Sequence, residues 1–205
     1  RAFQDTDVPG PTDPLEHLRI VEVELALADL ETVERQLEKQ RKSMRSDKTL
    51  AGTVALLERT HEALSEGIPL HRTNFTSEER HELQPFFLLT NKPALAIVNL
   101  DEDQVSEPES ILEPIKDEFN DSVDVIGMCI QLEAEAALLP PDQRGELLEG
   151  LGLGQGALPR FVRSAYHQLG LRTFFTTGEK ETRAWTFRSG SSAPECAGRI
   201  HTDFE

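Results

Sequence analysis

Apolar residues recur with the period of a helix through the first third of the chain. The stripe contains residues at seven-residue spacing and others between them: Ile20, Val23, Leu27, Leu30, Leu37 and Met44. This spacing predicts one long helix over about 15–44. A second stripe, from Leu50 to Ile68, predicts a helix that returns and stops near Gly67 and Pro69. Together the two stripes predict an antiparallel helical hairpin.

The pattern changes in the middle of the chain. Thr76 and Glu79 have the spacing of a capping box, which predicts the start of a third helix. Residues 94–100 (ALAIVNL) and 123–130 (VDVIGMCI) are continuous apolar runs of strand length. Such runs are typical of parallel strands that are covered on both faces. Because 107–120 has a helical pattern, the sequence predicts a right-handed βαβ unit here.

The last third combines helices with β structure. Residues 133–169 have a helical pattern, with breaks at Pro140 and at 150–156. From Arg172 the chain is rich in aromatic and β-branched residues, and Pro194 opens a short helix-like stretch. The expected fold class is therefore α/β. The chain starts and stops without a closing element, so we expect a fragment that is cut from both ends of a longer protein.

Composition excludes several classes of protein. The 205 residues are 38% apolar, which is enough for a real core, and no apolar run approaches the length of a membrane helix. The two cysteines, Cys129 and Cys196, lie far apart, which argues against a disulfide framework and a zinc knuckle. We therefore expect a cytoplasmic protein with no membrane partner. The net charge of −16 argues against a DNA-coating protein.

The charge is unevenly distributed. Residues 35–48 carry six basic and two acidic side chains, and 160–205 carry seven and five, whereas the rest of the chain is acidic. The basic segment lies between the two predicted hairpin helices and would form the tip of the hairpin. A solvated end explains such a segment, and so does a contact with RNA or an acidic partner. The candidate contact residues are Arg41, Lys42, Arg45 and Lys48.

Candidate chemistry follows the first predicted strand, which ends in Asn99-Leu100-Asp101-Glu102-Asp103. Ligands of open α/β sheets bind at the carboxyl ends of strands. There the Asn99 amide can bond a purine edge, and the Glu102 carboxylate can accept from a ring or exocyclic N–H. The guanine-specific version of this pattern is N-K-x-D. An acidic loop that caps the next helix explains the same residues.

The remaining motifs give weaker evidence of function. Asn91-Lys92-Pro93 precedes the strand and has Ala94 at the acidic position, so we interpret it as a loop. The glycines at 150–156 match neither a dinucleotide fingerprint nor a P-loop. The histidines have no metal-ligand spacing, and no nucleophile–base constellation can be argued, so no catalytic or metal residue is assigned. Cys129 is expected to be a small buried residue.

Several segments together resemble one family, the Obg-like ATPases of the YchF type. Residues 1–3 and 24–39 (RAF, ELALADLETVERQLEK) resemble the entrance to its helical insertion, and NLDED resembles its N-x-x-E base-recognition motif. Residues 131–135 (QLEAE) resemble its following S-A-K-L-E-type loop. Residues 173–205 are very similar to the start of its C-terminal TGS domain.

The resemblance implies a TRAFAC-class P-loop NTPase with a Rossmann-like parallel sheet, interrupted by a coiled-coil hairpin and followed by a β-grasp TGS domain. Four segments are then expected. Residues 1–14 end the first part of the nucleotide-binding domain, and 15–75 form the helical insertion. Residues 76–170 form the C-terminal part of the nucleotide-binding domain, and 171–205 begin the TGS domain.

The resemblance also implies a ribosome-associated enzyme that binds ATP with Mg²⁺ and hydrolyses it slowly. Asn99 and Glu102 would lie at the base, with Leu100 against the adenine. Cys129 and Ile130 would form the second loop, where they stand in place of the usual Ser and Ala. The carboxylate of N-K-x-D pairs with guanine N–H groups that adenine lacks.

The sequence has no G-x-x-x-x-G-K-[ST] motif and no Mg²⁺-binding Asp, so the metal ligands are expected upstream. We expect the longer parent to hydrolyse ATP and this fragment alone to be inactive. The alternative is a non-catalytic module, in which the helical arm and the TGS piece dock on ribosomal RNA or protein.

Overall fold

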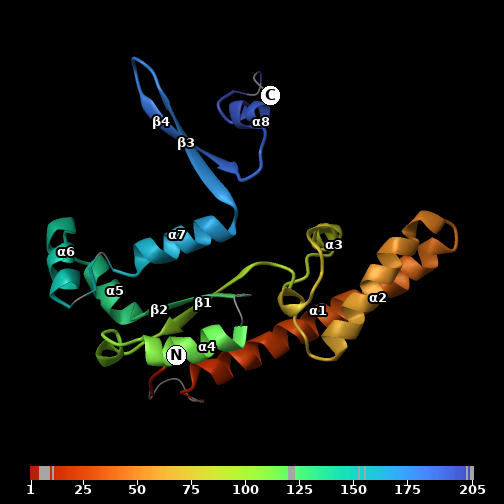
Figure 1. The fold of residues 1–205 in the computed structure, drawn as a ribbon, viewed down its shortest axis with the longest axis horizontal. Coiled ribbons are helices and arrows are strands. Elements are labelled where there is room, and N and C mark those ends of the chain that lie inside the picture. Colours follow the sequence, from red (N-terminus) through yellow and green to blue (C-terminus); the bar gives the residue numbers. More distant parts are fainter. Residues whose placement is uncertain are drawn as a thin grey trace. The chain divides into compact units, whose positions relative to one another are not determined.

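The structure is a computed structural model that describes residues 1–4, 10, 12–119, 123–151, 153–154, 156–201 and 203. Parts of two predicted features, the irregular N-terminal segment and the glycine-rich loop, lie outside these residues. The chain divides into two compact units, Arg1–Glu135 and Ala136–Glu205. The first contains the helical hairpin and a parallel sheet, and the second contains an antiparallel ribbon with helices (Figure 1).

The hairpin consists of α1 (Pro14–Met44) and α2 (Ala51–Ser65), which lie side by side in Figure 1. Asp13 caps α1, because its carboxylate accepts from the Leu15 amide at 2.9 Å. The turn between the helices is stabilised by Asp47, which accepts from the Thr49 amide at 3.0 Å. The predicted hairpin is therefore confirmed. We refer to α1 and α2 together as the arm.

One apolar cluster, the arm core, holds the arm together. Its buried members are Ala26, Val33, Leu37, Val54, Leu56, Leu57, Leu64, Leu70, Leu83 and Leu88. The predicted stripe on α1 is only partly correct. Leu37 is buried, but Ile20, Val23 and Leu27 are each about half exposed. The helix α2 has 15 residues and α1 has 31, so α2 ends before the first turns of α1, where these exposed side chains lie.

The arm is followed by α3 (Ser77–Leu83), which begins with the predicted capping box of Thr76 and Glu79. The chain then enters β1 (Ala94–Asn99), α4 (Glu109–Phe119) and β2 (Val123–Met128). The two strands pair in parallel, with Ala94 opposite Val123 and Asn99 opposite Met128. The predicted βαβ unit is confirmed.

A second cluster, the sheet core, packs α4 on the strands. Its buried members are Ala96, Val98, Leu100, Leu112, Ile115, Phe119, Val123 and Val125, and Leu15 and Leu18 of α1 pack against it. The expectation that both faces of each strand are covered is wrong for β1. Ile97 is 41% exposed although Ala96 and Val98 are buried, so the described chain covers one face of this strand.

The remaining elements follow in sequence order. They are α5 (Ile130–Ala137), α6 (Pro141–Gly150), α7 (Leu158–Gln168), β3 (Leu171–Thr177), β4 (Thr182–Arg188) and α8 (Ala193–Gly198). The strands β3 and β4 pair antiparallel, and Phe174 contacts Phe187 with ring centroids 5.8 Å apart. No described helix has both the length and the apolar character that crossing a membrane requires.

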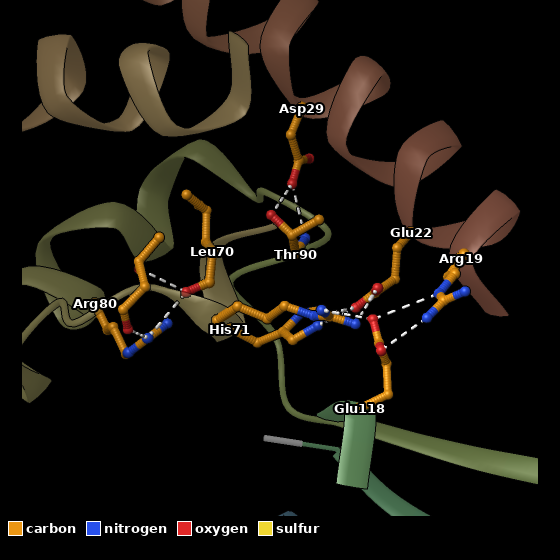
Figure 2. A network of polar contacts seen from close by, with 10 residues as sticks. Arg19, Glu22, Asp29, Leu70, His71, Arg80, Thr90 and Glu118 are labelled. Atoms are coloured by element: carbon orange, nitrogen blue, oxygen red, sulfur yellow. Dashed lines mark hydrogen bonds and ion pairs between the residues drawn. The ribbon is translucent and has the colours of Figure 1, made fainter. Parts of the chain in front are cut away.

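A buried carboxylate joins the arm to the segment that leads into β1. Asp29 of α1 is 2% exposed. It accepts from the backbone amides of Leu89 and Thr90, and from the Thr90 hydroxyl, at 2.7 Å each. Figure 2 shows Asp29 directed at Thr90. This carboxylate satisfies backbone donors that no strand or helix pairs, so it fixes the path of the chain before the sheet.

We expect Asp29→Ala to lower the free energy of unfolding by about 3 kcal/mol, because the buried amide and hydroxyl of Thr90 and the part-buried amide of Leu89 lose their acceptor. Urea unfolding followed by far-UV circular dichroism measures this. Glu31→Ala, an exposed carboxylate two residues along the same helix, is the matched control, with an expected loss below about 0.5 kcal/mol. Equal stability of the two variants would contradict the role of Asp29.

Candidate functional site

The carboxyl ends of β1 and β2 bring two predicted loops together. The Asn99 side-chain oxygen accepts from the backbone amide of Ile130 at 3.1 Å. The Leu100 amide donates to the carbonyl of Met128 at 2.9 Å. These bonds join the loop after β1 to the start of α5. Two of the residues expected at a nucleotide, Asn99 and Ile130, are therefore in direct contact.

The loop after β1 is a tight, capped turn. The Asp101 carboxylate accepts from the Glu102 amide at 2.9 Å, and the Gln104 side chain accepts from the Asp101 amide at 2.9 Å. This reciprocal capping box opens a 3₁₀ turn over Glu102–Gln104. Glu102 is exposed at the start of that turn. Its carboxylate is therefore presented to solvent on a backbone that is fixed from both sides.

Gln104 and Ala2, which the sequence did not mark as site residues, complete this turn. The Gln104 side-chain amide donates to the carbonyl of Ala2 at 2.9 Å. The Ala2 amide in turn donates to the carbonyl of Asn99 at 2.9 Å. The N-terminal residues thus lie along the end of β1. The D-x-x-Q spacing of a capping box was the available signal for Gln104, whereas no local pattern links Ala2 to a residue near position 100.

Leu100 has a buried side chain. Its side chain is 1% exposed and belongs to the sheet core. A Cβ added to Gly127 would lie 3.0 Å from a Leu100 methyl and 2.9 Å from a Leu112 methyl. The neighbouring strand therefore needs glycine at 127 to make room for these side chains. The side chain is therefore in the protein interior, whereas the backbone amide bonds the carbonyl of Met128.

The second loop is short and turns directly into α5. Cys129 is 5% exposed, which agrees with a small buried side chain, and its carbonyl accepts from the Glu133 amide at 3.2 Å. Ile130 is 46% exposed. The Gln131 side chain donates to the carboxylate of Glu135 at 3.1 Å. The loop can therefore offer backbone groups and an exposed apolar side chain to a ligand.

At the arm tip the four candidate cations differ. Arg41 pairs with Glu58 at 2.7 Å, and Lys42 pairs with Glu38 at 2.6 Å. The Lys42 ammonium lowers the pKa of Glu38 below its usual value, chiefly through this hydrogen bond. Arg45 and Lys48 are exposed, and within the described residues neither makes an ion pair.

A shallow hollow of about 330 Å³ lies on the arm beside these cations. It is lined by Glu34, Leu37, Glu38, Arg41, Lys42, Arg45 and His61. Its lining mixes both signs of charge, and His61 lies 3.5 Å from Glu34. The hollow therefore has no single charge preference. The cations available to an outside partner are Arg45, which lines the hollow, and Lys48, which does not.

The strand-end site has hydrogen-bond donors and acceptors, and its ionisable groups include the carboxylates of Asp101, Glu102 and Asp103. The described part of the chain contains no group of three or more His, Cys, Asp or Glu residues that could hold a metal ion. An amide, a carboxylate and free backbone groups suit a planar heterocycle with polar edges. This site can recognise a ligand, and its described residues supply no nucleophile–base pair.

The chain is similar over its full length to several known proteins. The chain is 37% identical over 212 residues to the Ribosome-binding ATPase YchF of Bacillus subtilis, and 33% identical over 219 residues to the Obg-like ATPase 1 of Schizosaccharomyces pombe. Each alignment covers 100% of this chain. A family profile described as "YchF-GTPase_C: Protein of unknown function (DUF933)" matches residues 171–205.

A solved structure is similar as well. The structure described as "Structure of the Schizosaccharomyces pombe YchF GTPase" matches with a TM-score of 0.83 and 30% identity, covering 100% of this chain and 57% of that one. The chain spans 58% of the length of its Bacillus relative.

Proposed function

We propose, since the chain belongs to the YchF-type family of Obg-like ATPases, that it provides the base-recognition edge of an ATP-hydrolysing, ribosome-associated protein. The observation that carries this proposal is the hydrogen bond between Asn99 and Ile130. It joins the two loops that the resemblance assigns to the base, at the end of a parallel sheet where ligands bind in this fold class.

The proposed chemistry favours adenine over guanine. Guanine presents two N–H donors on one edge, and a short carboxylate in the N-K-x-D position accepts both. Here Glu102 stands at that position on a capped turn. Its longer side chain would accept from the single exocyclic amine of adenine, while backbone amides of the second loop donate to ring nitrogens. Asn99 would orient the second loop, and Leu100 would contribute only its backbone.

Phosphate and metal binding would come from residues outside this chain. The sequence has no G-x-x-x-x-G-K-[ST] motif, and the described residues offer no metal-ligand cluster. The proposed enzyme is therefore the longer protein, with Mg²⁺ and ATP. This chain alone is proposed to release no phosphate from ATP above buffer background in a colorimetric assay, and turnover by the purified chain would refute that part.

We expect Glu102→Asp to shift nucleotide selectivity toward GTP when it is made in a longer protein that contains both this chain and a phosphate-binding loop. The shorter carboxylate restores the guanine-type acceptor, and one charge-assisted hydrogen bond corresponds to about a tenfold change in the ratio of the ATP and GTP dissociation constants. Competition binding with a fluorescent nucleotide measures this ratio.

Asp103→Glu is the matched control for this experiment. Asp103 is an exposed carboxylate one residue further along the same turn, and its conservative change should leave the ratio unaltered. If Glu102→Asp and Asp103→Glu give the same ATP preference, Glu102 does not read the base.

A second candidate function is docking on ribosomal RNA through the arm tip. The observation that favours it is that Arg45 and Lys48 are exposed, whereas Arg41 and Lys42 pair with acidic side chains. Unpaired cations on an otherwise acidic protein are available to phosphate groups. The contact would then be made mainly by Arg45 and Lys48, with Arg41 and Lys42 contributing less.

We expect the double variant Arg45→Gln/Lys48→Gln to co-sediment less with ribosomes and to lower the slope of log affinity against log salt by about 1.5, because two phosphate contacts are lost. The double variant Lys92→Gln/Lys116→Gln is the matched control. It loses the same charge at positions outside the arm tip, so it should keep the native slope. Identical slopes for both variants would reject the tip as the RNA contact.

A further inference from the structure

The arm and the βαβ unit have separate apolar cores. The arm core includes residues from Ala26 to Leu88, and the sheet core begins again at Ala96. The helix α1 belongs to both, because Leu15 and Leu18 pack on the sheet core whereas Ala26 lies in the arm core. Between these two cores lies a set of charged residues, the arm-root network, made of Arg19, Glu22, His71, Arg72 and Glu118.

Arg72 is the centre of the arm-root network. It lies in a short 3₁₀ turn, Leu70–Arg72, that follows α2. Its guanidinium binds Glu22 of α1 in a bidentate pair, at 2.6 and 3.1 Å. The same group lies over the ring of Phe119 in α4, 4.5 Å from the ring centroid, and 3.5 Å from Glu118. One side chain therefore contacts the arm and the βαβ unit at once.

Glu118 makes the link from the opposite side. Its carboxylate accepts from Arg19 of α1 at 2.8 and 3.4 Å, and it also faces Arg72. The Arg19 hydrogen bond is the largest cause that lowers the pKa of Glu118. Figure 2 shows Arg19 and Glu118 directed at each other.

Glu22 is held on both sides. Its two oxygens are shared between Arg72 and the Nε2 of His71, which lies 2.7 Å from one of them. The Glu22 side chain is only 12% exposed, and that of His71 is 10% exposed. A carboxylate in this position is costly without its cationic partner, so Arg72 cannot leave it without a penalty.

The junction is open to solvent beside this network. A hollow of about 230 Å³ is lined by Arg19, Glu22, Val23, Gly67, Ile68, Pro69, Arg72 and Glu118. Val23 is 48% exposed and Ile68 is 38% exposed, so apolar packing does not fill the junction on this side. Directional polar contacts, which can open and close as a unit, therefore hold the two bodies at this place.

We propose that Arg72 is a positioning residue that latches the arm to the βαβ unit. While Arg72 bridges Glu22 and Phe119–Glu118, the arm keeps one direction relative to the sheet that carries the strand-end site. When the bridge opens, the arm pivots on the contact of Leu15 and Leu18 with the sheet core. This inference concerns how the arm is held, and it does not depend on nucleotide or ribosome binding.

Arginine suits this position better than lysine. A planar guanidinium can bind a carboxylate with two parallel hydrogen bonds and stack on an aromatic ring at the same time. An ammonium group can keep the charge but loses the fork and the flat stacking face. The latch therefore predicts a graded series, in which Arg72→Lys has an intermediate effect and Arg72→Ala has the full effect.

Pulsed electron spin resonance can measure the arm direction in the full chain. Spin labels at Ser46→Cys on the arm tip and Glu113→Cys on α4, in a Cys129→Ala/Cys196→Ser background, report the distance between the two bodies. We expect one narrow distance distribution for this background. Arg72→Ala should broaden it by about twofold or more, with Arg72→Lys between the two, because the open state becomes populated.

Arg59→Ala is the matched control. Arg59 also pairs with a glutamate, Glu79, and lies over an aromatic ring, Phe75, at 4.9 Å. Both of its partners belong to the arm side of the junction. Its loss should lower the melting temperature but leave the distance distribution narrow, which separates latching from general destabilisation.

Glu118→Gln keeps the shape of the side chain and provides a second test if Arg72→Ala fails to fold. We expect it to broaden the distribution in the same direction. A folded Arg72→Ala protein with the background distribution overturns the latch, and so does an unchanged distribution in Glu118→Gln. Equal broadening in Arg59→Ala also overturns it, because the effect would then follow from lost stability alone.

Discussion

The buried carboxylate of Asp29 is the constraint on which the strand-end site depends. It binds the chain at Leu89 and Thr90, shortly before β1 begins, through three hydrogen bonds of 2.7 Å. A two-stranded sheet is marginally stable by itself and needs other elements packed against it. Because α1 carries Asp29, the entry of the chain into β1 is tied to this point of α1. The placement of β1 in turn places the loops at the carboxyl ends of β1 and β2.

The arm and the sheet meet through the apolar contact of Leu15 and Leu18 with the sheet core and through polar contacts beside it. Each body has its own core, and the arm-root network occupies the boundary between them. A wholly apolar junction would fix the relative orientation of the arm and the sheet less selectively. Bidentate ion pairs favour one orientation, and their partners can bind water instead when the pairs break. The arm is therefore attached to the βαβ unit in one orientation by contacts that can break. The tip of the arm exposes Arg45 and Lys48 to solvent.

The sequence predicted those features that depend on local patterns. The seven-residue stripe indicated α1, the Thr76–Glu79 spacing indicated the start of α3, and the apolar runs indicated the parallel strands. It also placed Asn99 and Ile130 at adjacent strand ends. Each of these depends on periodicity or on capping chemistry, which are properties of short segments.

The features that the sequence did not predict depend on contacts between distant residues. An aspartate on a helix, such as Asp29, has the pattern of a solvated residue, and only the fold shows that it is buried. The burial of Leu100 follows from the space over Gly127, and the exposure of Ile97 follows from which face α4 covers. The bond between Ala2 and Asn99 joins residues with no shared local pattern.

The central claim, that the loops joined by Asn99 and Ile130 recognise adenine, is tested most directly by amide hydrogen exchange with and without ADP. The measurement requires a protein that joins this chain to a phosphate-binding loop. The account predicts that ADP slows amide exchange at 100–104 and 129–131 and leaves exchange at the arm tip, 43–50, unchanged. It also predicts that ADP slows exchange in the two loops more than GDP does. Slower exchange elsewhere, with both loops unchanged, would contradict it.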